Sequence, residues 1–123
     1  MPSNDPLYIQ AGELRHSIQI QQASATRDAV GQPVSTWNVV LNTRAKIENT
    51  NSRTFKESFS NNALASQSTD CITIRWPGPT IDLAPGMRVI FGDNTFLVQA
   101  VDNVLRRNRK VVLACIGINE DSN

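Results

Sequence analysis

The side chains that could act as acid, base or nucleophile are few in this sequence and lie far apart. The single histidine, His16, falls on the apolar face of the first predicted strand, whereas a catalytic base must be held beside its nucleophile. Asp82, Asp93 and Asp102 each lie at or next to a turn, where aspartate hydrogen-bonds local backbone. No pair of carboxylates stands out. We therefore expect a packed or interface histidine, no catalytic residue and no enzymatic activity.

Metal and cofactor chemistry are equally poorly supported. Cys71 and Cys115 have no CxxC spacing and no histidine nearby, and each lies in an alternating apolar run, so we expect two reduced, half-buried strand cysteines. The glycines of PGPTIDLAPG are those of turns and lack the strand, loop and helix order of a phosphate-binding loop. The sequence predicts no metal and no cofactor.

Length and charge restrict the class of protein. The 123 residues fit one domain, and 12 Lys and Arg against 11 Asp and Glu leave no bulk charge to attract nucleic acid or an anionic membrane. The opening MPSNDPLYIQ lacks the pattern of a signal peptide, and no apolar run approaches the roughly 20 residues of a spanning helix. We expect a soluble, unsecreted protein with no membrane partner.

Alternation of apolar and polar residues predicts strands through most of the chain. The expected strands are residues 14–22, 35–49, 70–76, 87–91, 95–104 and 109–118. Asp28, Gly31 and Pro33 supply a turn that makes the first two strands a hairpin, with a bend in the second near Asn42, and short turns make the last three a meander. The fold class is all-β: a small antiparallel, partly closed barrel of about six strands with at most one short helix. Trp37 and Ile74 are expected core residues.

One long polar segment, residues 48–66, interrupts this pattern. Phe55, Phe59 and Ala63 follow one another at helical spacing, which predicts a short helix near residues 53–60 ended by Asn61 and Asn62. Compact domains usually join strands with two to six residues, and longer loops are either functional or disordered. Both interpretations remain open for this segment.

The cluster RRNRK at a predicted hairpin is the sharpest charge feature. It can be a solvated turn that discourages aggregation, a protein contact or a phosphate contact. Single-strand-binding barrels usually add exposed aromatic residues, but aromatic residues are only 6% of this chain and lie in strand patterns that suit packing. As candidate interface residues we take Arg15, His16, Arg106, Arg107, Arg109 and Lys110.

The order of the motifs resembles the tailed-bacteriophage head-tail joining family, also called head-tail adaptors or head-closure (stopper) proteins. The motifs are AGELRHSIQIQQ, DAVGQPVSTW, RAKIEN, DCITIRW, GMRVIFGDNTFLVQAVDNV and RKVVLACIGI. The matching residues are Gly12, Leu14, Arg15, His16, Asp28, Gly31, Trp37, Ile74, Arg75, Arg88 and Val89. The chain departs from the family in an extension, residues 1–10, and in lacking a glycine shortly after the second strand. Residues 11–118 would be the barrel domain and 119–123 a tail.

The resemblance implies a virion protein that forms a homo-oligomeric ring under the portal, assembles in the host cytoplasm and provides the platform for tail proteins. It further implies that the long segment projects from the barrel into the channel and helps retain packaged double-stranded DNA, without sequence preference. The candidate channel residues are Asn49, Thr50, Asn51, Ser52, Arg53, Thr54, Phe55, Lys56, Glu57, Ser58, Phe59, Ser60, Asn61 and Asn62. We expect few core residues among them. A tail-completion (tail terminator) ring protein and an oligonucleotide-binding barrel remain the alternatives.

Overall fold

The computed structural model describes residues 12, 14–27, 29–31 and 33–118. The expected N-terminal extension (1–10), the C-terminal tail (119–123) and the turn residue Asp28 lie outside these described residues.

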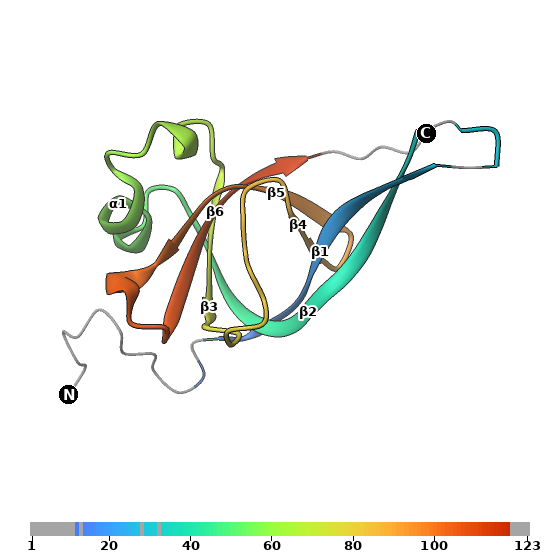
Figure 1. Ribbon diagram of the computed structural model, residues 1–123. Helices are drawn as coiled ribbons and strands as arrows, with labels where there is room; N and C mark the ends of the chain where they lie inside the picture. Colours follow the sequence, from blue (N-terminus) through green and yellow to red (C-terminus); the bar gives the residue numbers. More distant parts are fainter. Residues whose placement is uncertain (1–11, 13, 28, 32, 119–123) are drawn as a thin grey trace.

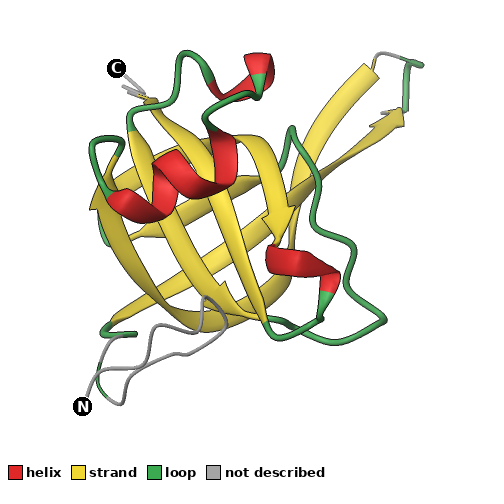
Figure 2. Ribbon diagram, turned by 90° about the vertical axis from the view of Figure 1, so that its left-hand side faces the viewer, coloured by secondary structure: helices red, strands yellow, loops and turns green. Residues whose placement is uncertain are grey.

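Six antiparallel strands form a closed barrel, so the predicted all-β class is confirmed (Figures 1 and 2). The order around the barrel is β1-β2-β3-β6-β5-β4, and pairing of β1 residues 19–21 with β4 residues 88–90 closes it, where the sequence predicted only partial closure. The elements are β1 (His16–Arg27), β2 (Pro33–Asn49), α1 (Arg53–Phe59), the 3-10 turn η1 (Ala63–Ala65), β3 (Asp70–Arg75), β4 (Arg88–Phe91), β5 (Asn94–Asn103), the 3-10 turn η2 (Val104–Arg106) and β6 (Lys110–Ile118).

Apolar side chains from all six strands fill the barrel. Ile20, Ile74 and Val89 are fully buried there, together with residues from the remaining strands. Because alternate residues of a strand point to the same side of the sheet, the period-two pattern in the sequence is the pattern of inward-facing side chains. The prediction that Ile74 is a core residue is confirmed.

Two neighbouring strands, β3 and β6, are buried on both faces. Cys71–Ile74 and Val111–Cys115 are unbroken runs of buried residues. Their outward-facing members, including Cys71, Val112 and Ala114, form a second apolar cluster with Phe59 and other residues outside the barrel. The long segment after β2 therefore covers the barrel wall at this place (Figure 2).

The β1–β2 hairpin continues well beyond the barrel. β1 pairs with β4 only as far as Gln21, while its pairing with β2 runs on to the Arg27–Pro33 pair. A register shift between Ile20 and Gln21 marks the place where the hairpin leaves the barrel, close to the predicted bend. We call residues 22–38 the arm; it extends from the barrel in Figure 1.

The sequence predicted turn chemistry, and not a ribbon, for much of the arm. Its residues are mostly small and polar, with side chains such as Ser24 and Thr36 paired across the two strands at 3.2 Å. The described part of the chain has no second sheet to cover either face of the arm, so no apolar alternation marks it as strand.

Candidate functional site

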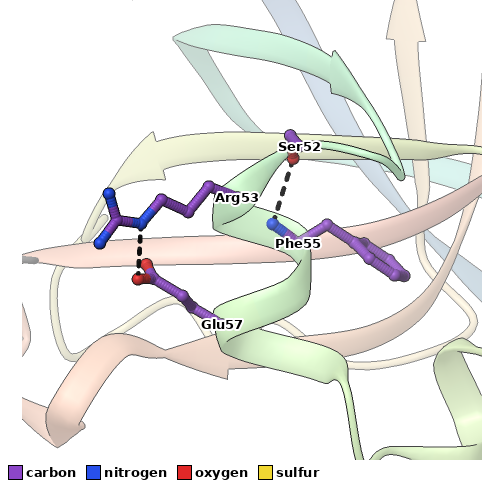
Figure 3. A network of polar contacts seen from close by, with 4 residues as sticks. All are labelled: Ser52, Arg53, Phe55 and Glu57. Atoms are coloured by element: carbon purple, nitrogen blue, oxygen red, sulfur yellow. Dashed lines mark hydrogen bonds and ion pairs between the residues drawn. The ribbon is translucent and has the colours of Figure 1, made fainter.

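A short helix forms the centre of the long segment between β2 and β3. α1 begins where Ser52 caps it: the Ser52 hydroxyl accepts a hydrogen bond from the Phe55 N–H at 3.1 Å (Figure 3). Arg53 and Glu57, one turn apart, form an exposed ion pair at 3.1 Å. The helix predicted near residues 53–60 is confirmed, although it ends at Phe59, before the expected Asn61.

Two phenylalanines anchor this helix on the barrel. Phe55 and Phe59 lie with their ring centroids 5.5 Å apart, and Phe59 is only 3% exposed. Phe59 belongs to the cluster that contains Cys71, Val112 and Ala114, and α1 packs on β5 and β6. As expected, few of the candidate channel residues are core residues, since Phe59 alone among them is buried, but the helix packs on the barrel wall instead of projecting from it. The aromatic pair buries the segment against the outer wall, because these apolar rings lose their contact with water there.

The burial of Cys71 and Cys115 differs from the expectation of half-buried thiols. Both are free and fully buried. They lie on opposite faces of the sheet, Cys71 in the outer cluster and Cys115 in the barrel core. Burial raises the pKa of the Cys71 thiol from 9.0 to about 12; the Glu48 charge adds to this, and a hydrogen bond from Ser52 opposes it. Burial also raises the pKa of Cys115. Neither thiol is a candidate nucleophile.

The outer side of the segment carries the polar character that the sequence indicated. Lys56, Ser60 and Asn61 are exposed, and so are Asn49, Asn51, Arg53 and Glu57. The remaining candidate channel residues, apart from buried Phe59, are half-buried. Thus, among the described residues, the helix has one face on the barrel and one exposed face.

A cavity of about 470 Å³ lies beside α1. We call it the α1 cavity. Phe55 and Phe59 supply aromatic surface, and hydroxyl and amide groups supply the rest; the lining is Thr50, Phe55, Phe59, Ser60, Asn61, Asn62, Ala63, Ala65, Ser66 and Ser68. None of these residues is charged. A cavity of this size and composition suits an uncharged group of a partner molecule better than a charged substrate.

The basic turn between β5 and β6 lies on the same side of the barrel as α1 (Figure 1). Arg106, Arg107 and Arg109 are exposed, while Lys110 is half-buried. The turn is held by Asn103, whose side-chain NH₂ donates to the Asn108 side-chain oxygen at 2.7 Å and whose own side-chain oxygen accepts the Asn108 N–H at 3.1 Å. Val104, just before the turn, packs against the outer cluster beneath α1. The exposed arginines therefore lie on a turn whose conformation is fixed by side-chain hydrogen bonds.

Arg15 and His16, the other candidate interface residues, lie at the start of β1. The His16 ring packs edge-on against Phe91 with centroids 4.9 Å apart, as a packed histidine would. The Arg15 side chain is exposed and donates from Nε to the Gly12 carbonyl at 3.0 Å. β1 and β6 are not neighbours in the barrel, so no strand pairing joins this pair to the basic turn.

Trp37 is not the core residue that the sequence predicted. It is half-buried on the arm, outside both apolar clusters, and the Arg88 guanidinium lies 4.2 Å from the centroid of its ring. Arg88 in turn donates from Nε to the side-chain oxygen of Gln21 at 2.6 Å. Trp37 pairs with Ala23 beyond the register shift, in the part of the hairpin that has left the barrel. It fastens the base of the arm by a cation–π contact instead of filling the barrel.

Among the described residues, no three His, Cys, Asp or Glu side chains gather as a metal site would require. The described helices are all too short to span a membrane. The features that remain are surfaces: the α1 segment with its cavity, the basic turn and the arm. They are surface features of a small closed β-barrel.

Comparison with known families identifies the group of proteins to which this barrel belongs. The phage head completion protein family matches residues 9–117, nearly the whole chain. The chain belongs to this family and is a structural protein of the phage virion, made to assemble with other head or tail proteins. The resemblance to head-tail joining proteins that the sequence showed is thereby confirmed.

Solved structures share the fold. The solution structure of protein SF1141 from Shigella flexneri 2a is 24% identical, with a TM-score of 0.65, over 92% of this chain and 100% of that one. A chain in the virion of a native gene transfer agent particle is 16% identical, with a TM-score of 0.56, over 85% of this chain and 96% of that one. At such low identity these likenesses support the fold alone. Comparison with curated protein sequences finds no match.

Proposed function

We propose that this protein completes the DNA-filled head as a homo-oligomeric ring under the portal or a portal adaptor. The ring extends the channel, helps to retain the packaged DNA and presents the platform to which tail proteins attach. The observation that carries this proposal is the family match over nearly the whole chain. The match also favours a head protein over the alternative of a tail-completion ring.

The α1 segment is the part that we assign to the channel. Its outer face is polar, with the cations Arg53 and Lys56 set against Glu57, so its net charge is only slightly positive. The arginines of the basic turn lie on the same side of the barrel. Such a surface can lie next to DNA without binding phosphates tightly, and copies of it around a ring can hydrogen-bond to one another. We assign Arg15, His16 and the basic turn to contacts with neighbouring virion proteins.

The anchoring of α1 changes how this role must be tested. Deleting the segment would uncover the outer apolar cluster, so loss of function would not separate misfolding from loss of a gate. We therefore choose exposed residues of the segment that do not line the cavity and replace three together: Asn51→Ala, Lys56→Ala and Glu57→Ala. The matched control replaces three exposed residues elsewhere: Thr80→Ala, Asp82→Ala and Asp93→Ala.

Heads lacking the protein are completed with each variant, and two quantities are measured: the protein bound per head and the DNA that stays protected from nuclease. Both variants should bind heads as the natural chain does. The α1 variant should lose DNA before tails attach, and the control should retain it. Equal retention by the two variants would remove the channel role from α1. Failure of the natural chain to bind portal-bearing heads would overturn the head-completion function itself.

A further inference from the structure

Two arginines and a lysine on three neighbouring strands form one row across the outer face of the barrel. In the antiparallel register of β2 with β3, Arg44 and Arg75 are the next residues after the last pair, Ala45–Ile74. Arg75 also pairs with Lys110 of β6. Ala45 and Ile74 are fully buried inside the barrel, so the residues that follow them point outward, and both arginines are exposed.

This row joins two groups of cations that lie at the same end of the barrel. Figure 1 places the start of β1, the end of β3 and the basic turn at that end. β2 and β3 lie between β1 and β6, and Arg44 donates from Nη1 to the backbone carbonyl oxygen of Arg15 at 3.2 Å. We call the resulting surface the basic band. Its members are Arg15, Arg44, Arg75, Arg106, Arg107, Arg109 and Lys110, of which all six arginines are exposed.

The exposed arginines of the basic band have no matching anions among the described residues. The ion pairs Lys46–Glu48 and Arg53–Glu57 lie outside the band, and no described carboxylate pairs with its arginines. Like charges on opposed residues of neighbouring strands repel each other and destabilise a sheet. A partner with carboxylates would relieve this repulsion, because a guanidinium group can bind a carboxylate through two parallel hydrogen bonds.

A groove of about 420 Å³ beside the band favours a polypeptide as the partner over DNA. Ser17, Gln19, Asn42 and Arg44 belong to its lining, and Gln19 donates from its side-chain NH₂ to the Asn42 side-chain oxygen at 3.3 Å. Hydroxyl and amide groups both donate and accept hydrogen bonds, which suits the N–H and C=O groups of a polypeptide backbone. The phosphate oxygens through which DNA is mainly contacted only accept.

The charges next to the band point the same way. Asp102 pairs with Val112, which lies on the same outward face of β6 as Lys110. The unbroken negative charge of a DNA duplex would be repelled by this carboxylate, whereas a protein segment can place a neutral residue opposite it.

We propose that the basic band and this groove bind an acidic, extended segment of a neighbouring virion protein. Carboxylates of the segment lie against Arg15, Arg44 and Arg75, and its backbone lies along Gln19 and Asn42. The inference deepens the proposed function, which assigns Arg15 and the basic turn to neighbouring virion proteins, by adding Arg44 and Arg75 and by specifying the charge of the partner. It rests on the proposed function only for the assignment of the segment to a virion protein.

The contact is tested on the free, full chain labelled with ¹⁵N. The probe is a synthetic peptide of alternating glutamate and serine, and its control is the same peptide with glutamine in place of glutamate. The acidic peptide should shift the amide signals of residues 15–19, 42–44 and 75, and the glutamine peptide should leave them in place.

Two variants test whether the position of the cations matters. Arg44→Gln combined with Arg75→Gln should weaken binding of the acidic peptide at least several-fold. The matched control, Arg53→Gln combined with Lys56→Gln, removes the same charge from exposed positions of α1 and should bind the peptide as the natural chain does. Because all four residues are exposed, both variants should keep the dispersed amide spectrum of the folded barrel.

The proposal is overturned if the acidic peptide shifts none of these signals, or if the two variants lose the same affinity, since net charge alone would then explain binding. A DNA duplex is titrated in the same way, and tighter binding of the duplex than of the peptide would make the band a DNA surface instead. Binding to portal-bearing heads is measured separately. A chain that binds the peptide through the band but does not bind heads keeps this inference and loses the proposed function, and the reverse result does the opposite.

Discussion

Two segments of this chain leave the barrel, and they are held in opposite ways. The α1 segment folds back on the outer wall, where Phe59 joins an apolar cluster with β3, β5 and β6. The arm runs away from the barrel and is held by strand pairing, by side-chain hydrogen bonds such as Asn38 to Ser24 at 3.0 Å, and by Trp37 at its base. The comparison teaches that a polar segment need not be loose: two aromatic residues at helical spacing suffice to fix it.

The stability of the first segment should depend on Phe59. Truncation to Ala removes a buried ring and leaves a cavity over Cys71, so we expect a loss of about 3–5 kcal/mol of unfolding free energy. Chemical denaturation measures this, and the reactivity of Cys71 with a thiol reagent should rise. Leu64→Ala is the matched control in the same segment, because Leu64 is exposed, and it should change stability by less than about 0.5 kcal/mol. Similar stabilities for the two variants would show that α1 is not anchored.

Substitutions at Ile74 and Trp37 compare the contribution to stability of a residue in the barrel with that of a residue in the arm. Ile74→Ala should cost about 2–5 kcal/mol, since Ile74 is fully buried inside the barrel. Trp37→Leu keeps apolar bulk but removes the cation–π contact with Arg88, so its cost should be about 0.5–1 kcal/mol. Denaturation midpoints of both variants provide the measurement. Equal losses of unfolding free energy in the two variants would indicate that Trp37 is a core residue, as the sequence predicted.

Ser52 tests how the helix begins. Ser52→Ala removes the acceptor for the Phe55 N–H, and the loss of such a cap costs about 1 kcal/mol. Ser60→Ala, at the other end of α1, is an exposed serine on the same segment and should change stability by less than about 0.5 kcal/mol. Thermal or chemical unfolding of the two variants measures the difference. Equal losses of unfolding free energy would mean that the Ser52 cap does not contribute to stability.

Shortening the arm should have the smallest effect on the fold. Residues 24–36 are removed, and Asn-Gly joins Ala23 to Trp37, which are opposite each other in the hairpin. Because the removed residues whose side chains the structure describes lie outside both apolar clusters, the unfolding free energy should change by less than about 0.5 kcal/mol. A large loss would show that the arm supports the barrel. An intact fold would show that the barrel does not need the arm.

Local features of the sequence determined the strands, the helix and the turns of this protein. Alternating apolar residues specified all six strands, because one face of each looks into the barrel. Phe55 and Phe59 specified the helix by their spacing, and Gly92 fits the tight β4–β5 turn, where its φ is +59°. The same features, taken in order, indicated the family.

Only the tertiary structure decided which strands are also covered on the side that faces away from the barrel interior. Alternation reports one buried face, and the burial of Cys71 and Val112 on the other depends on contact with Phe59, a distant residue in a polar stretch. Trp37 shows the reverse case: its aromatic character predicts the core, but the hairpin leaves the barrel before reaching it. Whether an apolar residue finds a partner depends on where the chain passes in space, which residue types and spacing do not determine.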